Sequence, residues 1–183
     1  TFFSSATGPI IIGVFLLLTG SFIWLLPGAY NVLDSGYASL DGLFLIAPWV
    51  YLFLIPALTM RMFSEEYRTG TMELLLTKPV SRWSVLMSKF MAGWILVVAA
   101  LIPTLIYLYS VCLLGVPAGN IDFGGFWGSF LGLILLASVY VAIGVCASSL
   151  TDNPVVSFIL AAFVSFLLYA GFDSFSELFT NGR

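Results

Sequence analysis

The 183 residues of the chain are 61% hydrophobic and only 8% charged, with a net charge of −3 at pH 7. Soluble domains carry roughly 25% charged residues, so this chain has too few charges to cover a water-facing surface. The composition therefore excludes a soluble globular domain and predicts an integral membrane protein.

Five nearly continuous apolar runs predict the membrane-spanning helices. They cover residues 9–26, 43–60, 90–114, 126–150 and 155–172. A helix needs about 20 apolar residues to cross the hydrocarbon layer, and each run approaches or exceeds that length. None of the runs alternates strictly, as the strands of a membrane barrel do. The predicted fold class is all-α, a polytopic membrane helical bundle. Because all five runs reach spanning length, an alternative with three spans and two buried helices is disfavoured.

Prolines and polar turns set the expected helix ends. Pro103 interrupts the third run, and prolines commonly kink or break membrane helices. Before the fifth run, Asn153 is expected to cap the helix and Pro154 to occupy its first turn. We expect residues 29–42 to form a polar loop and residues 173–183 to form an unpatterned tail.

The distribution of charge predicts the orientation. Five of the six basic residues fall in one loop, residues 61–89: Arg61, Arg68, Lys78, Arg82 and Lys89. By the positive-inside tendency this loop is cytoplasmic. The loops on the other side then contain Asp34, Asp41 and Asp122, and no basic residue.

The first part of the cytoplasmic loop is expected to continue the second helix beyond the membrane surface. Arg61 and Glu65 lie four residues apart, and Glu65 and Arg68 three apart, so both pairs can interact on one helix face. Gly70 is then expected to break this helix.

A short helix is predicted from Thr71 to Lys78, with Thr71 as its N-cap and Pro79 as its limit. Its apolar side chains share one face at helical spacing: Met72, Leu75, Leu76 and Pro79. Two turns of helix are too short to be stable alone, so the segment needs a surface on which to dock. That surface is either the bilayer or the groove of a cytosolic partner, and we prefer the second hypothesis.

The sequence offers little support for catalysis. Histidine is absent, which removes the commonest general base and metal ligand. Cys112 and Cys146 lie in apolar runs and read as buried small residues. No charge lies at mid-span, where it would indicate a proton or ion pathway. Small residues recur every four positions in the fourth run, which favours close helix packing: Gly124, Gly128 and Gly132, then Gly144 and Ser148.

The string EEYRTGTMELLLTKPVSRW, followed by a spanning helix, resembles the coupling-helix segment of ABC type-2 permeases. The motif matches at Glu66, Arg68 and Val80, and at the residues we expect to dock on a partner ATPase: Gly70, Thr71, Met72, Glu73, Leu75, Leu76 and Pro79. The strings LDSGYASLDGLF, APWVYLFLIPALTMRMF and SSLTDN extend the resemblance, to the gliding-motility permeases of bacterial ABC transporters. Such permeases usually have six spans, so the resemblance implies a single permease domain, residues 1–183, truncated at one or both ends.

The resemblance implies a non-catalytic membrane subunit of the bacterial inner membrane. It binds no cofactor itself, while ATP and Mg²⁺ bind a separate cytosolic ABC ATPase. The other implied partners are a second permease chain, identical or related, and the lipid bilayer, with no nucleic acid. Two other functions stay open: a scaffold or mechanical subunit that moves no solute, and, much less favoured, an intramembrane enzyme.

Overall fold

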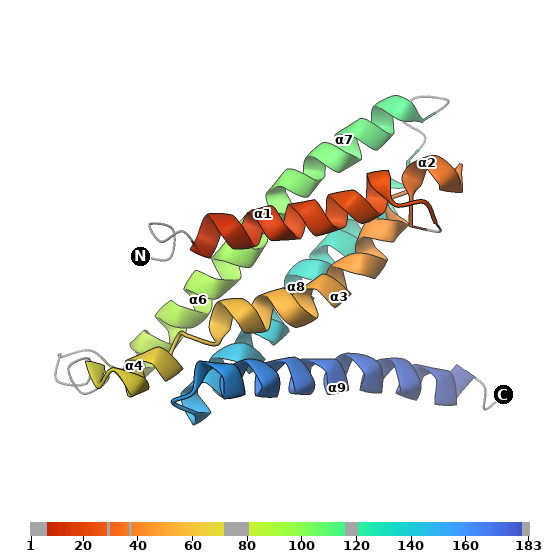
Figure 1. Cartoon of the computed structure of the whole chain (residues 1–183). Helices are drawn as coiled ribbons and strands as arrows, with labels where there is room; N and C mark the ends of the chain where they lie inside the picture. Colours follow the sequence, from red (N-terminus) through yellow and green to blue (C-terminus); the bar gives the residue numbers. More distant parts are fainter. Residues whose placement is uncertain (1–6, 29, 37, 72–80, 116–120, 181–183) are drawn as a thin grey trace.

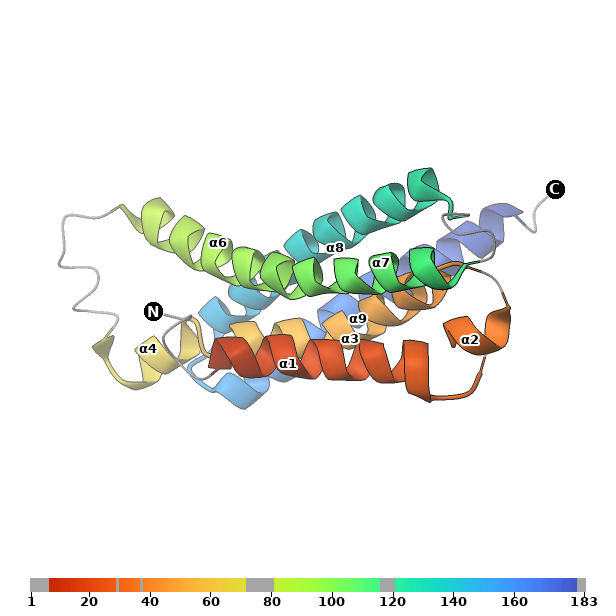
Figure 2. The ribbon, with the colours of Figure 1, turned by 90° about the horizontal axis from the view of Figure 1, so that it is seen from above.

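The computed structural model describes residues 7–28, 30–36, 38–71, 81–115 and 121–180. Within these ranges the chain forms helices and turns, and no strand. Five helical segments of the described chain are long and apolar enough to cross a membrane. Their arrangement as a bundle is visible in Figure 1 and, from above, in Figure 2. The predicted all-α helical bundle is therefore confirmed.

The described helices follow the predicted runs closely. In chain order they are α1 (Thr7–Gly20), the π-helix η1 (Ser21–Leu25), α2 (Val32–Ser35), α3 (Asp41–Thr59), α4 (Ser64–Arg68), α6 (Arg82–Leu101), the 3₁₀ turn η2 (Ile102–Thr104), α7 (Leu105–Leu114), α8 (Phe123–Leu150) and α9 (Pro154–Thr180).

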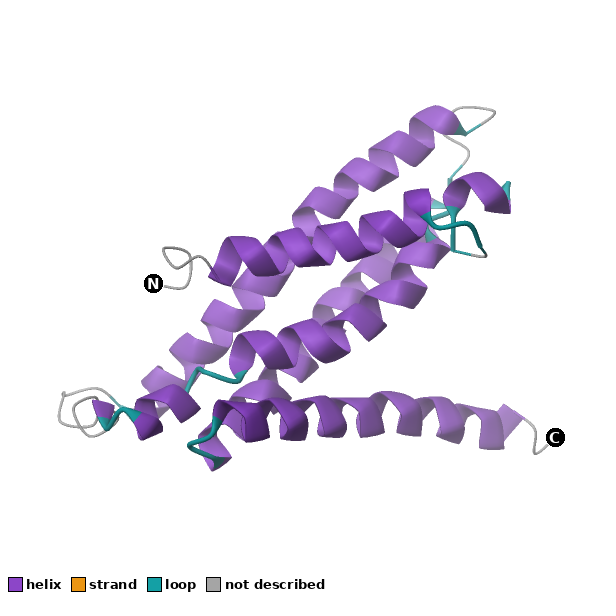
Figure 3. Cartoon of the chain, viewed as in Figure 1, coloured by secondary structure: helices purple, strands orange, loops and turns teal. Residues whose placement is uncertain are grey.

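Successive spans run in alternating directions, so the connecting segments gather at two opposite ends of the bundle (Figure 3). One end, here called the basic end, holds α4, the start of α6 and the turn between α8 and α9 (Figure 1). Arg61, Arg68 and Lys89 belong to it. The other, the acidic end, holds α2 and the start of α8, with Asp34 and Asp122. The separation of charge expected from the sequence is thus present.

The centre of the bundle is built by α3 and α8. α3 packs against α1, α8 and α9, while α8 packs against α3, α6 and α9. Tyr51 and Ile55 of α3 and Val141 of α8 are fully buried. The outer helices expose apolar side chains, such as Leu17 of α1 and Leu167 of α9. In a bilayer these side chains face lipid, so the exposure is expected rather than costly.

Local capping explains several helix ends. The Ser81 side chain accepts a hydrogen bond from the Ser84 amide at 3.2 Å, which fixes the start of α6. Asn153 accepts from the Val155 amide at 3.0 Å, and α9 begins at Pro154. Pro103 lies in η2, which separates α6 from α7. The expected roles of Asn153, Pro154 and Pro103 are confirmed.

Several expectations about residues outside the spans and about burial were wrong. Cys146, which was expected to be buried, is exposed. The loop between the first two spans contains a short helix, α2, because Asn31 accepts a hydrogen bond from the Leu33 amide at 2.8 Å and Gly36 ends the turn with φ +68°. The unpatterned tail predicted from Asp173 onward is helical as far as Thr180. Polar residues alone do not end a helix, and the sequence places no glycine or proline between these two positions.

Only part of the small-residue pattern in α8 serves packing within the described chain. A Cβ added to Gly144 would lie 2.8 Å from the Cβ of Thr59, so α3 and α8 approach closely there. Cβ atoms added to Gly128 or Gly132 would meet nothing within 4 Å. The close-packing prediction is therefore confirmed at the basic end of α8, whereas no neighbour within the described chain approaches Gly128 or Gly132.

This difference gives a matched test of helix packing. Gly144→Ala is expected to lower the free energy of unfolding by roughly 1–3 kcal/mol, because α3 must shift to admit the methyl group. Gly132→Ala on the same helix is expected to be neutral or stabilising by up to about 1 kcal/mol, because alanine favours helix. Unfolding of both variants in detergent micelles measures the difference. Equal effects would contradict the close α3–α8 contact.

Candidate functional site

The second span does not run on as one helix to Gly70, contrary to the expectation from the sequence. α3 ends at Thr59 and α4 begins at Ser64. Residues 60–63 between them form turns. The interruption lies where the span reaches the basic end (Figure 1). The short helix α4 is therefore connected to α3 by turns and is not a continuation of it. We call residues 60–63 the joint.

A side chain from α8 explains the interruption. In an unbroken helix the Ser64 amide would donate to the Met60 carbonyl. Instead the Ser148 hydroxyl stands between them: it accepts from the Ser64 amide at 3.2 Å and donates to the Met60 carbonyl at 3.1 Å. It also accepts from the Phe63 amide at 2.9 Å. One donor and two acceptor positions exhaust what a hydroxyl can offer, so the buried Ser148 is fully satisfied.

A side chain from α6 completes the joint on another side. The Lys89 ammonium donates to the Met62 carbonyl and lies 4.1 Å from the centre of the Phe63 ring. It also pairs with the Glu66 carboxylate of α4, with Nζ and Oε2 2.5 Å apart. The Lys89 side chain is 13% exposed and that of Glu66 is 27% exposed. Shielding from water makes such a pair stronger than a typical surface ion pair.

Glycines on both partner helices let them reach the joint. Gly93 lies one turn after Lys89, and a Cβ there would lie 3.0 Å from the Met62 Cε atom. Gly144 lies one turn before Ser148 and faces Thr59. Each helix thus presents a residue without a side chain beside a polar residue that bonds to the joint. The spacing i, i+4 places both on the same helix face.

The ion pairs expected along the second helix are not formed. Among the described residues, the ion pair that the structure shows is Lys89–Glu66, not Arg61–Glu65 or Glu65–Arg68. The joint changes the spacing between Arg61 and Glu65, because the two no longer lie on one helix. Arg68 is exposed, and a long side chain in water gains little from a fixed pair.

The predicted docking residues are only partly within the described chain. Gly70 has φ +69°, a left-handed conformation that ends α4, as expected. The Thr71 hydroxyl lies 3.0 Å from that of Thr69, and both residues are exposed. The remaining docking residues fall outside the described ranges: Met72, Glu73, Leu75, Leu76 and Pro79.

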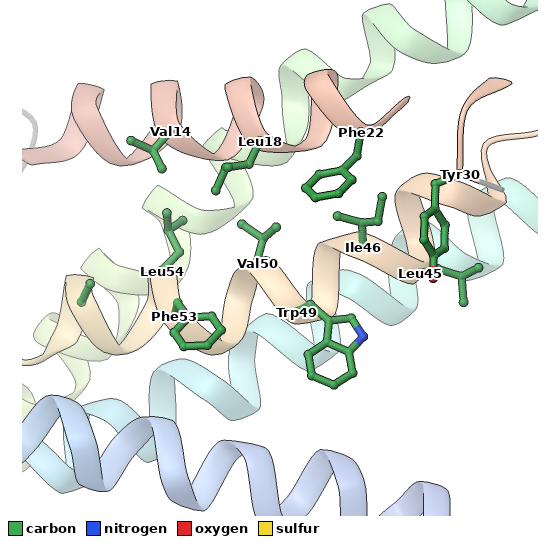
Figure 4. Close-up of a pocket in the computed structure, with 11 residues that line it drawn as sticks. Val14, Leu18, Phe22, Tyr30, Leu45, Ile46, Trp49, Val50, Phe53 and Leu54 are labelled. Carbon is green, nitrogen blue, oxygen red and sulfur yellow. The ribbon is translucent and has the colours of Figure 1, made fainter. Parts of the chain in front are cut away.

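A second feature is an apolar groove between α1 and α3, with a volume of about 510 Å³. Figure 4 shows Val14 and Leu18 of α1 and Phe22 of η1 facing Val50 and Leu54 of α3 across it. The groove lies along the membrane-spanning parts of both helices, and its lining is almost wholly apolar. Such a surface accommodates lipid chains or another apolar helix and offers no catalytic group.

Sequence reasoning identified part of this site. It singled out Ser148 for its spacing from Gly144, as a packing residue, and it placed Lys89 in the basic loop. It did not find that both side chains bond to residues 60–66. The signal was weak: the repeat Lys89–Gly93 on α6 mirrors Gly144–Ser148 on α8, but such pairs are common in membrane helices.

Comparison with known proteins gives the family. Residues 8–181 match the family model described as ABC-2 family transporter protein. No curated protein and no solved structure matches the chain. The matched range includes every described span and the joint. The chain belongs to the ABC-2 family of transporter proteins, as a multi-pass membrane permease subunit.

Proposed function

We propose that this permease subunit docks a separate cytosolic ABC ATPase on the segment from Gly70 to Pro79 and is driven by it. The family implies an ABC ATPase partner. The observation that supports docking on this segment is that the helices before and after it, α4 and α6, are bonded to each other and to the bundle. α4 is bonded to α6 and α8 through Lys89 and Ser148, and the segment that follows α4 leads directly into α6.

The chemistry of the segment fits a protein groove. Met72, Leu75 and Leu76 supply an apolar face, and Glu73 a polar contact beside it. A segment held at both ends by the bundle passes on a displacement that a free loop would absorb. ATP and Mg²⁺ bind the ATPase on this proposal, and the permease binds neither.

On this proposal the subunit pairs with a second permease chain, identical or related, and the transport pathway lies between the two chains. Location in a bacterial inner membrane is another part of the proposal. The resemblance to gliding-motility permeases supports a role in that process. It also supports the other candidate, a mechanical subunit that moves a machine without moving solute. Transport of solute by the reconstituted complex in liposomes distinguishes the two.

The orientation is tested by single cysteines in a chain whose Cys112 and Cys146 are replaced by alanine. Tyr67→Cys on α4 and Leu33→Cys on α2 both place the thiol at an exposed position. In intact cells a membrane-impermeant maleimide is expected to label position 33 and spare position 67 until the cells are opened. The reverse pattern would place the docking segment outside and remove its role.

Docking is tested by adding charge to the predicted apolar face. Leu75→Asp with Leu76→Asp is expected to leave membrane insertion intact and to abolish co-purification of an ATPase and the ATP turnover it brings. The matched control is Leu74→Asp with Thr77→Asp, which adds two equal charges on the opposite side of the predicted helix. We expect the control to retain both properties.

Two results would contradict docking by this face. The first is unchanged ATP turnover in the Leu75/Leu76 variant. The second is equal loss in the variant and the control, which would show that added charge anywhere in the segment disrupts the complex.

A further inference from the structure

We propose that Ser148 and Lys89 are positioning residues that lock α4 to α8 and α6. A displacement of the docking segment, Gly70 to Pro79, then reaches the bundle through α8 and α6 and not along α3. This inference rests on the proposed function, because the displacement comes from the ATPase. It adds the route by which motion enters the membrane.

The first step is that the backbone hydrogen-bond ladder between α3 and α4 is interrupted. The helix is interrupted over residues 60–63, where the hydroxyl of Ser148 replaces the direct bond between the Ser64 amide and the Met60 carbonyl. The Ser64 hydroxyl still donates to the Met60 carbonyl, but without the backbone bond the two helices can change their mutual angle. A kink with a side chain inserted into the hydrogen-bond ladder is a recognised site of bending.

The second step is that side chains tie α4 to its neighbours at two points. Ser148 bonds to Phe63 and Ser64 at the start of α4, and Lys89 pairs with Glu66 one turn further along. Two attachments on one short helix fix its position and also its direction. α4 also packs directly against α8 and α9.

The third step is that these ties are hard to break where they are shielded from water. Ser148 is fully buried, and without it the amides of Phe63 and Ser64 lose their acceptor. An unpaired buried backbone group is costly, because burial leaves no water to replace the lost bond. Lys89 likewise has its charge compensated by Glu66 and by the Met62 carbonyl. The ties are therefore expected to persist while α4 moves.

The test measures whether α4 and α8 move as one body. Spin labels are placed at Tyr67→Cys on α4 and Asp152→Cys in the turn after α8, both exposed positions, in a chain whose Cys112 and Cys146 are replaced by alanine. The complex is purified from membranes through a tag on this chain. Distances are recorded without nucleotide and with the non-hydrolysable analogue AMP-PNP.

The wild-type complex is expected to give one narrow distance that stays the same with and without nucleotide. In the variant that combines Ser148→Ala with Lys89→Met, we expect the distance distribution to broaden and the distance to change with nucleotide. The ATPase should still co-purify with this variant. The single variants should each broaden the distribution in part, which preserves the test if the double variant accumulates poorly. The narrowness of this distance, rather than thermal stability, distinguishes positioning from a general structural role.

The matched control is Ser88→Ala with Ser149→Ala. These hydroxyls neighbour the two positions in sequence but bond to carbonyls of their own helices, at Val85 and Cys146. The control should behave as wild type.

Two outcomes would overturn the inference: a nucleotide-dependent distance in the wild type, or an unchanged narrow distance in the Ser148/Lys89 variant. Failure of the proposed function would be seen separately, as the absence of any nucleotide-hydrolysing subunit from the wild-type preparation.

Discussion

Backbone amides and carbonyls that are buried away from water need hydrogen-bond partners, so a buried helix can be interrupted only where the protein itself supplies them. At residues 60–63 those partners come from other helices, since Ser148 bonds to both sides of the gap and Lys89 caps the Met62 carbonyl. Two threonine hydroxyls in the bundle behave differently. Thr19 and Thr59 donate back to carbonyls of their own helices and leave the ladder intact. Two hydroxyls therefore bond to the Met60 carbonyl, that of Ser64 and that of Ser148, and the Ser148 hydroxyl is the one that crosses between helices.

That crossing bond requires unusually close helices, and the neighbouring glycines provide them. At Gly144, α3 comes so near to α8 that a methyl group would collide with Thr59. One turn later on the same face, Ser148 reaches the backbone beyond Thr59. Gly93 and Lys89 repeat the arrangement from α6. Small residues thus bring the backbones together, and the adjacent polar residues use that proximity.

Hydropathy and turn chemistry were sufficient to predict the spans, their alternation and several helix ends. They act within one run of sequence, so the cap at Asn153 and the break at Pro103 could be predicted locally. The interruption of the second span could not, because its cause lies 84 and 85 residues away in the sequence, at Ser148. The sequence of residues 60–63 contains no glycine or proline that would indicate a break. The extension of α9 was missed for the opposite reason: polar residues suggested a tail where no breaker exists.

The position of the joint matters because α3 is poorly suited to move. It contacts α1, α8 and α9, and most of its apolar side chains are buried, so tilting it would require repacking on several sides at once. α6 is less enclosed: it packs mainly on α1 and α8, and buries residues only in its second half. A displacement delivered through Lys89 enters α6 in its less packed first half. Because Ser148 ties α4 to α8 and Lys89 ties it to α6, a displacement of α4 passes to both helices at the basic end, and residues 60–63 take up the change in angle relative to α3.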